Sequence, residues 1–449
     1  MKPKEIGIAS VQKRRDFILC ALGIFLIAFV ARIIFAFFAL KNNAVLYPDS
    51  YDYIRLADSI CQNFSYGFNC QEIFRVPVYP VYLALIKFFF PSSFIPFTVI
   101  TQSILDSLTA IMIFLIALRI FKYLAFAAIT GLFYAFSPLA ISSFTQILSE
   151  TLFAFLLVCL LLFLVRFTDR KPSVAFCFTV GIVMAVLTLT RVVFLPLSLL
   201  FLFFVLIKTK SFKAFLLTGL TCYIILFGWG LRNYLASDYF GISTVSAINT
   251  YRYNACALEA KITEKPFSQI QKEFDSKLSA LKTQKEQADF ASKEGWKIIF
   301  EYPFKYAIIQ LKTSLNTLLP VSGDFIRAFG FQLGDNGTLA VINSEGLIAG
   351  VKYYFSGNFG LFLILLPLTI LLFIQYIMSV IGAIRALKDS NGQFLFVFLL
   401  ILCAVYFILV GGPASTPRFR LPAEGIIFIF ASYGLYVICQ LLLRRRNGC

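Results

Sequence analysis

Long apolar blocks dominate the hydrophobic pattern of this chain. Most run for about 17 to 25 residues, the length that a helix needs to cross roughly 30 Å of hydrocarbon. The segment 304–320 is less apolar and is either an interfacial helix or half of an additional pair of spans. The pattern predicts an all-α, polytopic helical membrane protein with about ten transmembrane helices, or 11–13 in the alternative. The ten predicted spans lie near residues 17–40, 94–118, 123–143, 148–165, 174–190, 192–207, 212–231, 358–383, 394–411 and 421–443.

Composition and charge support this interpretation. Of the 449 residues, 59% are hydrophobic and 14% are charged, whereas soluble globular chains are typically about 45 to 50% apolar. The basic residues gather at every second predicted boundary, which is the positive-inside pattern and places both termini in the cytoplasm. The net charge of +17 therefore indicates membrane topology, and no nucleic-acid partner is expected. The basic clusters are Lys13-Arg14-Arg15, Arg119 with Lys122, Arg166 with Arg170-Lys171, Lys208 with Lys210 and Lys213, Arg385 with Lys388, and Arg444-Arg445-Arg446.

Three of the segments on the opposite, non-cytoplasmic side stand out. In the first, residues 41–93, the stretch from Asp49 to Ile60 has apolar side chains at helical spacing and predicts a juxtamembrane helix capped by Asp49. The second is more polar and predicts a mostly helical outer region, and the third is the short turn 411–422. The expected organisation is an N-terminal transmembrane module, 1–231, then the outer region 232–357 and the C-terminal transmembrane helices 358–449.

The sequence contains no histidine, which excludes histidine bases, Ser-His triads and histidine metal ligands. Acid–base chemistry must therefore use carboxylates, tyrosine, lysine or cysteine. Ten cysteines are present, and most lie in apolar segments as small hydrophobic residues. Cys61 and Cys70 both lie in the first outer loop, where they could form a disulfide in an oxidising compartment.

Acidic and arginine side chains gather in the three outer segments. A guanidinium group matches phosphate oxygens with two parallel hydrogen bonds and stays charged at any working pH. In a membrane, the natural ligand with this chemistry is a lipid phosphate. If the turn at 418–420 is extended, both of its arginines point the same way. The residues of this set are Asp49, Asp52, Arg75, Arg232, Arg418 and Arg420.

Each of these residues also has a structural alternative. Asp49 would serve only as a helix cap, Arg75 as a headgroup anchor, Arg232 as a snorkelling side chain and Asp52 as a solvated one. Glu150 begins a predicted span, where the helix N-terminus stabilises a carboxylate by up to about 1 kcal/mol.

A further carboxylate, Asp106, lies near the middle of its predicted span. A charge there costs roughly 2.5 to 3.5 kcal/mol on insertion scales and needs a partner. Arg32, at a similar distance from the outer face, is the predicted partner in a structural pair.

An ordered series of short motifs covers nearly the whole chain: Pro48-Asp49-Ser50-x-x-Tyr53, Arg75-x-Pro77-x-Tyr79-Pro80, Ser149-Glu150, Trp229-x-x-Arg232-Asn233 and Arg418-x-Arg420-x-Pro422. The series resembles the GT-C membrane glycosyltransferases, in particular the protein-mannosyltransferase and aminoarabinose-transferase-like group (glycosyltransferase family 39-like). Two departures stand out. Val78 replaces a common glycine, and Ser50 follows Asp49 where those branches have an Asp-Glu pair. No Trp-Trp-Asp motif is present, which argues against an oligosaccharyltransferase.

The resemblance implies a GT-C-like fold and transfer of a sugar from a polyprenyl-phosphate-linked donor, with inversion, to a lipid, glycan or protein acceptor on the non-cytoplasmic face. It implies a location in a bacterial inner membrane. Asp49 would be the catalytic base and Glu150 a second catalytic acidic group, with Asp52 as a possible secondary acid. The substrate- and phosphate-binding residues would be Arg75, Tyr79, Arg232, Arg418 and Arg420. A divalent Mg²⁺ or Mn²⁺ ion could bridge Asp49 and the phosphate.

Two other functions stay open from the residues alone. A lipid or glycolipid transporter, or flippase, also needs arginines for phosphate and an apolar groove, but it moves its substrate without cleaving a bond. A glycan polymerase or ligase of different fold also works on lipid-linked sugars, and it would rely on a later outer loop than 41–93.

Overall fold

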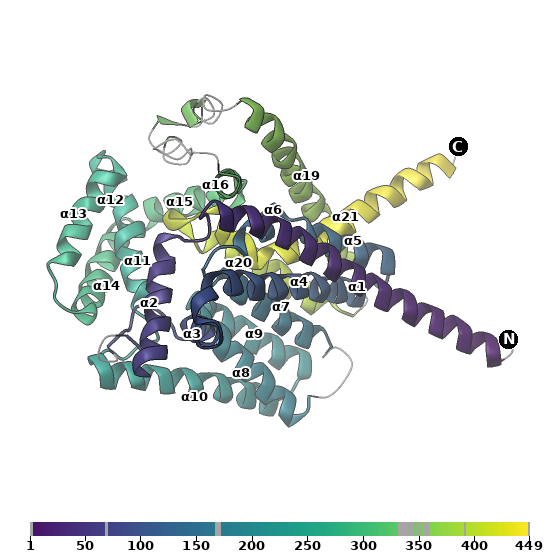
Figure 1. Ribbon diagram of the computed structural model, residues 1–449, viewed down its shortest axis with the longest axis horizontal. Helices are drawn as coiled ribbons and strands as arrows, with labels where there is room; N and C mark the ends of the chain where they lie inside the picture. The colour runs from purple at the N-terminus through teal and green to yellow at the C-terminus, as the bar shows by residue number, and fades with distance from the viewer. Residues whose placement is uncertain are drawn as a thin grey trace.

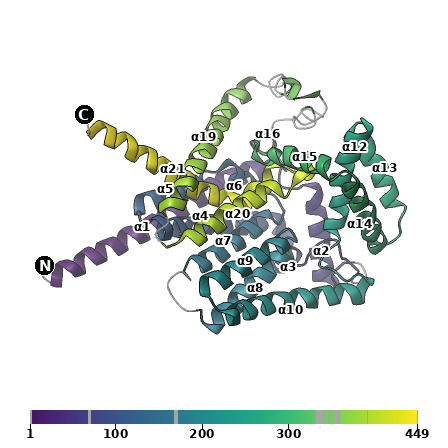
Figure 2. The ribbon, with the colours of Figure 1, turned by 180° about the vertical axis from the view of Figure 1, so that it is seen from behind.

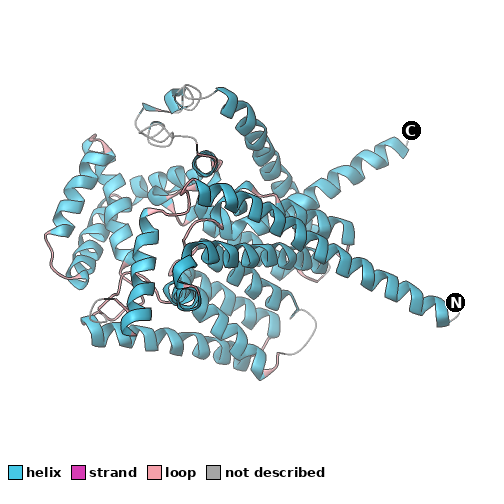
Figure 3. Cartoon of the chain, viewed as in Figure 1, coloured by secondary structure: helices cyan, strands magenta, loops and turns pink. Residues whose placement is uncertain are grey.

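The computed structural model describes residues 3–67, 71–166, 172–330, 341, 345–346, 348–350, 353, 359–389 and 392–447. Within these residues the regular structure is helical and no strand occurs (Figure 3), which confirms the predicted all-α class. The first ten helices are α1 (Pro3–Lys41), α2 (Pro48–Asn63), α3 (Val78–Phe89), α4 (Phe94–Phe121), α5 (Leu124–Ala135), α6 (Pro138–Ser143), α7 (Glu150–Arg166), α8 (Val174–Thr190), α9 (Phe194–Thr209) and α10 (Phe212–Ser237). They are followed by α11 (Val245–Asn249), α12 (Cys256–Thr263), α13 (Phe267–Ser279), α14 (Gln284–Glu301), α15 (Pro303–Ser314), α16 (Ser322–Ala328), α19 (Phe359–Asp389), α20 (Phe394–Leu409) and α21 (Leu421–Asn447).

The helices account for the predicted membrane spans. Five segments are long and apolar enough to cross a membrane, by length and composition: Arg15–Lys41, Pro91–Phe121, Phe212–Ser237, Leu365–Asp389 and Pro417–Leu443. Shorter apolar helices, among them α5, α7, α8, α9 and α20, lie where the other five spans are predicted. The chain is therefore a polytopic helical protein, as expected. The stretch 304–320 forms α15 and a short 3₁₀ helix, Leu315–Leu318.

The predicted continuous span at 123–143 is wrong in one respect, because it is broken into α5 and α6. The side chain of Ser137 accepts a hydrogen bond from the backbone N–H of Ala140, which makes Ser137 the N-cap of α6. Pro138 follows as the first helical residue, where its missing N–H costs nothing. A proline also disfavours helical geometry in the residue before it, so α5 cannot run through Ser137.

The helices form a bundle with its two chain ends on one side (Figures 1 and 2). The long α4 packs against α1, α5 and α7 in the centre, and fully buried apolar side chains such as Phe114, Leu157 and Ile429 fill the space between these helices and α21. At the opposite end lie α2 and the group α11–α14 (Figure 1). This is the end that the charge pattern predicts to be non-cytoplasmic.

A buried ion pair crosses the centre of this bundle, as predicted. The Arg32 Nε atom donates to Asp106 Oδ2 at 2.6 Å, and both side chains are at most 1% exposed. The hydroxyl of Tyr134 donates to the other carboxylate oxygen at 2.6 Å, and the guanidinium also donates to the carbonyl oxygens of Ala28 and Ala135 at 3.0 Å. These contacts join α1, α4 and α5 around a charge that would otherwise be costly to bury.

The helices α19 and α21 cross at a close contact between glycines. A Cβ atom on Gly382 would collide with the carbonyl oxygen of Phe430, and one on Gly434 would collide with that of Met378. Beyond this contact, a mostly apolar cavity of about 440 Å³ lies between α19, α21 and the α5–α6 break. Its few polar wall residues include Gln375, Arg420 and Glu424.

Candidate active site

The start of α2 determines where Asp49 lies. The helix begins at Pro48, and Tyr47 is the extended N-cap residue, whose N–H donates to the Ser50 hydroxyl at 3.0 Å. Asp49 is therefore in the first turn and does not cap the helix, contrary to the sequence-based expectation. The reason is again that proline favours the first helical position, which moves the cap from the expected Asp49 to Tyr47, two residues earlier. This leaves the Asp49 carboxylate available for other partners.

Two arginines from distant parts of the chain contact Asp49. Arg75 Nη2 donates to Asp49 Oδ1 at 2.8 Å, and Arg418 Nη2 donates to Asp49 Oδ2 at 3.2 Å. Arg75 also donates to Asp52 Oδ2, through Nη2 at 3.0 Å and Nε at 3.3 Å. The Asp49 side chain remains 39% exposed, so it lies at the surface of the network that it joins.

These contacts lower the pKa of Asp49 below its ordinary value of 3.8. Partial burial alone would raise the pKa, but the charges of Arg75 and Arg418, and the hydrogen bonds they donate, outweigh that effect. Asp49 is therefore an ionised hydrogen-bond acceptor at neutral pH.

Glu150, at the first position of α7, extends the network. Its Oε1 atom lies 2.8 Å from Arg191 Nη1 and 3.5 Å from Arg418 Nε, so Arg418 lies between the carboxylates of Asp49 and Glu150. Arg191 also donates to the Ser149 hydroxyl at 3.3 Å. Arg191 belongs to none of the sequence motifs described above. The one sequence feature that could have indicated a role for Arg191 is that it is a lone arginine between two predicted spans, on the side predicted to be non-cytoplasmic.

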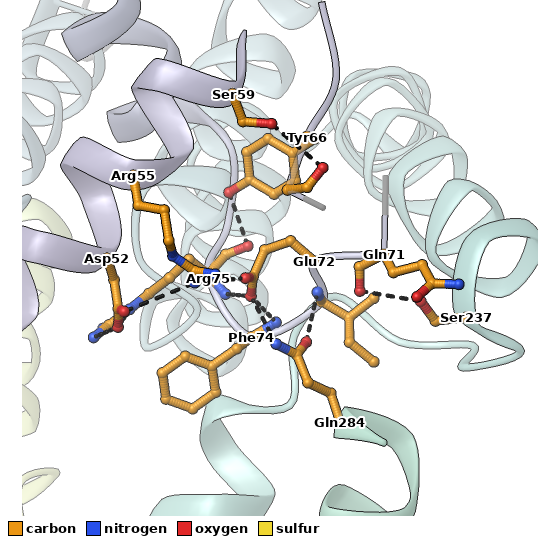
Figure 4. Close-up of polar contacts among 12 residues, drawn as sticks. Asp52, Arg55, Ser59, Tyr66, Gln71, Glu72, Phe74, Arg75, Ser237 and Gln284 are labelled. Carbon is orange, nitrogen blue, oxygen red and sulfur yellow. Dashed lines mark hydrogen bonds and ion pairs between the residues drawn. The ribbon is translucent and has the colours of Figure 1, made fainter. Parts of the chain in front are cut away.

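The loop that carries Arg75 is held by Glu72, a second residue that sequence reasoning missed (Figure 4). Glu72 is 4% exposed, and its Oε1 atom accepts the backbone N–H groups of Phe74 and Arg75 at 2.8 and 3.2 Å. Its Oε2 atom lies 3.3 Å from Arg55 Nη2. The Tyr66 hydroxyl donates to the Arg75 carbonyl oxygen at 3.0 Å. These contacts fix the backbone of Arg75, and so they hold its side chain where it can reach Asp49.

Aromatic side chains support the same loop. The Arg75 guanidinium lies 4.9 Å from the ring centre of Tyr53, a distance typical of cation–π contacts, and Tyr53 meets Tyr79 edge to face. Tyr79 is fully buried and donates its hydroxyl to Gln102 Oε1 at 2.8 Å. Its described contacts are therefore packing contacts and this hydrogen bond, and the substrate contact expected from the motif stays a prediction.

Arg232 and Arg420, also expected to bind phosphate, have other partners. Arg232 donates to the backbone carbonyls of Glu72 and Tyr66 at 2.6 and 3.0 Å, so it supports the first outer loop. Arg420 is 1% exposed and pairs with Glu424 at 2.9 Å. The turn around it is not extended as expected: Pro417–Arg420 form a 3₁₀ helix, which directs Arg418 and Arg420 to different partners.

A further carboxylate, Asp324, approaches from α16. Asp324 Oδ1 accepts a hydrogen bond from the hydroxyl of Tyr47 at 2.6 Å, and the Arg327 guanidinium lies 4.5 Å from the centre of the same ring. Burial raises the pKa of Asp324 above its ordinary value, although hydrogen bonds from Tyr47 and Gln146 oppose that rise. The α16 helix is thereby tied to Tyr47, the N-cap residue of α2.

The described side chains around Asp49 do not by themselves form a divalent-cation site. No group of three or more His, Cys, Asp or Glu side chains that could hold a metal ion occurs among the described residues. Both Asp49 oxygens face guanidinium groups, whose positive charge opposes a second cation. The Mg²⁺ or Mn²⁺ ion expected from the sequence remains a prediction. The expected disulfide also stays untested, because Cys70 lies outside the described residues.

No protein-family model and no curated protein matches the chain. Among solved structures, it is similar to the oligosaccharyltransferase AglB from Archaeoglobus fulgidus in complex with an inhibitory peptide and a dolichol-phosphate, with 17% identity and a TM-score of 0.46, over 94% of this chain and 51% of that chain. A complex of the A. fulgidus enzyme with Zn and sulfate gives 16% identity and a TM-score of 0.49, over 92% and 49%. ArnT from Cupriavidus metallidurans bound to undecaprenyl phosphate gives 15% identity and a TM-score of 0.38, over 94% and 77%.

The chain thus spans about half the length of the AglB structures that it matches. AglB and ArnT are both GT-C fold glycosyltransferases, the class that the sequence motifs resemble. With TM-scores below 0.5 and identities of 15 to 17%, these likenesses decide neither the activity nor the substrate.

Proposed function

We propose that this protein is an integral membrane glycosyltransferase. It transfers a sugar from a polyprenyl-phosphate-linked donor to a lipid, glycan or protein acceptor on the non-cytoplasmic face, with inversion at the anomeric carbon. The observation that carries the proposal is the pairing of Asp49 with Arg75 and Arg418 at the end of an apolar helical bundle. A carboxylate base and phosphate-binding guanidiniums are the two kinds of group that this reaction needs.

The charges of the network indicate how a donor would bind. The three carboxylates of Asp49, Asp52 and Glu150 face the three guanidiniums of Arg75, Arg191 and Arg418. Because these charges balance, a donor phosphate must compete with a carboxylate for its arginine. When the phosphate binds Arg75 and Arg418, it draws positive charge away from Asp49, whose pKa then rises toward its ordinary value and makes it a better base.

In the reaction, Asp49 accepts the proton of the acceptor hydroxyl as that oxygen attacks the anomeric carbon. The bond from that carbon to the phosphate oxygen breaks on the opposite face, which inverts the configuration. Arg75 and Arg418 stabilise the negative charge that develops on the departing lipid phosphate. Glu150 holds Arg418 and Arg191 in position and keeps the site ordered between turnovers.

The apolar cavity of about 440 Å³ supports a lipid-linked donor rather than a water-soluble one. Its walls include Arg420, two residues from Arg418, and Phe325, next to Asp324. An isoprenoid chain in this cavity would therefore lie near segments that carry the charged network. Because α19 forms one wall of the cavity, such a chain would enter from the bilayer beside α19.

The test is transfer of labelled sugar from synthetic polyprenyl-phosphate sugars by the purified, reconstituted protein. Asp49→Asn keeps the size of the side chain but removes the base, and should lower transfer by about 100-fold or more. The matched control is Asp58→Asn, because Asp58 lies on the same helix and pairs with Lys87 outside the network. It should retain wild-type transfer.

The outcomes separate the proposal from its rivals. Equal transfer by wild type and Asp49→Asn, with both proteins equally folded by thermal unfolding, would refute the assigned base. Movement of an intact fluorescent glycolipid across the membrane, without transfer from any donor tried, would instead identify a transporter.

A further inference from the structure

A strip of exposed apolar side chains runs from the end of α14 along α15. Within the part of the chain that the structure describes, no side chain covers it. Phe300 and Phe304 are 71% and 85% exposed, although aromatic side chains are normally at least half-buried. On α15 the exposed members follow at helical spacing, so they form one narrow stripe along the exposed side of the helix. The strip consists of Trp296, Phe300, Phe304, Ile308, Leu311 and Leu315.

Lysines flank this strip along its length. Lys293 and Lys297 lie on α14 one turn from Trp296 and Phe300, and Lys305 and Lys312 lie on one edge of the α15 stripe. All four are exposed, against two carboxylates in the same stretch, Glu294 and Glu301. An apolar stripe bordered by lysines matches a bilayer surface, which is apolar beneath a layer of anionic headgroups.

The position of α15 is fixed beside a predicted span. Gln310 Nε2 and Ser314 Oγ both donate to the carbonyl oxygen of Leu409 at 2.9 and 2.8 Å, and Leu409 is the last residue of the apolar helix α20. These bonds satisfy a carbonyl that the end of α20 leaves without a helical partner. They also hold α15 where the predicted span leaves the hydrocarbon, at the level of the headgroups.

From these three observations we propose that the strip docks the α14–α15 corner onto a bilayer containing anionic phospholipid, with its apolar side chains below the headgroups and its lysines on their phosphates. This role concerns membrane attachment of the outer helices and does not depend on the proposed sugar transfer. In Figures 1 and 2, α15 leads from the outer helices toward the bundle, as an element at this boundary would.

The chain suits a direct test, because it has only two tryptophans. In the full-length Trp229→Phe protein, Trp296 is the sole indole fluorophore and lies in the strip. The protein is reconstituted in phosphatidylcholine vesicles whose lipids carry bromine near the top of the acyl chain, with or without phosphatidylglycerol. Contact with the brominated chains should reduce Trp296 emission at least about twofold, more strongly with phosphatidylglycerol, while acrylamide in the water quenches it weakly.

The lysine contribution is measured with paired charge changes. Lys293→Gln with Lys297→Gln, which leaves Lys305 and Lys312 in place, should lower the extra quenching that phosphatidylglycerol gives. Lys265→Gln with Lys272→Gln removes the same charge at exposed positions away from the strip and should leave it unchanged. Ready quenching by acrylamide but not by brominated lipid would overturn the proposal. So would protection from both quenchers, which would mean that protein covers the strip.

Discussion

Arg418 is the residue on which the candidate site depends most. It is the only arginine in the described network that contacts both the α2 carboxylate Asp49 and the α7 carboxylate Glu150. Sequence reasoning could select Asp49, Arg75, Glu150 and Arg418, because each stands in a motif on the predicted non-cytoplasmic side. It could not select Arg191, because this residue stands alone between two predicted spans and belongs to no motif. It also could not separate Arg418 from Arg420, since that choice depends on a 3₁₀ turn.

The pH dependence of the reaction should report the contact between Arg75 and Asp49. A base works in its ionised form, so the rate falls as the pH drops through its pKa, and the low pKa of Asp49 places that fall in the free wild-type enzyme below the ordinary value of 3.8. Arg75→Gln removes the largest lowering influence, so the pKa should rise and the acid limb should move to higher pH. The profile of kcat/KM against pH measures this directly.

The control for that shift is Arg55→Gln. Arg55 carries the same charge and lies 3.8 Å from Asp52, but its side chain is 61% exposed, so solvent screens its effect on Asp49. Its acid limb should stay close to that of the wild type. If the Arg75→Gln variant is active and the acid limb of its kcat/KM profile lies at the same pH as in the wild type, Asp49 is not the titrating base.

At the scale of the elements, two prolines determine helix boundaries that the apolar pattern does not predict. Pro138 divides an apolar block into α5 and α6, and Pro48 starts α2 before Asp49. Hydropathy averages over many residues, so it finds where helices lie but not where one proline interrupts them. By contrast, α8 has the predicted limits. Ser173 caps its first turn, and Arg191, the polar residue that ends the apolar block, comes directly after its last residue.

The cross-helix pair in the bundle should matter for stability. Asp106→Ala leaves the buried Arg32 guanidinium without its carboxylate, a change that typically costs about 3 to 5 kcal/mol. The purified variant should therefore unfold at a clearly lower temperature in detergent than the wild type. Asp58→Ala removes a carboxylate from a partly exposed pair and should have a small effect. Normal folding and activity of Asp106→Ala would contradict the structural role assigned to this pair.

For the molecule as a whole, alternating charge predicted which loops share an end of the bundle, and the candidate site uses loops from that end. The pattern could not predict which helices touch. The contact between α19 and α21 depends on two glycines. A glycine in an apolar helix does not indicate which other helix packs against it.

Gly434→Leu should force these two helices apart, because its side chain would meet the backbone of α19. Overpacking of this kind typically costs about 1 to 3 kcal/mol, measured as a lower unfolding temperature. Gly23→Leu is the matched control, since a Cβ atom there would have no heavy atom within 4 Å. If both variants unfold like the wild type, α19 and α21 do not meet at this crossing.

The cavity between α19 and α21 also bears on how the rate would depend on the amount of donor. A lipid that enters beside α19 diffuses in two dimensions and never passes through water. Its supply is then set by its mole fraction in the bilayer, not by its molarity in the sample. Adding inert phospholipid at constant total donor would slow such an enzyme, whereas adding buffer would leave its turnover unchanged.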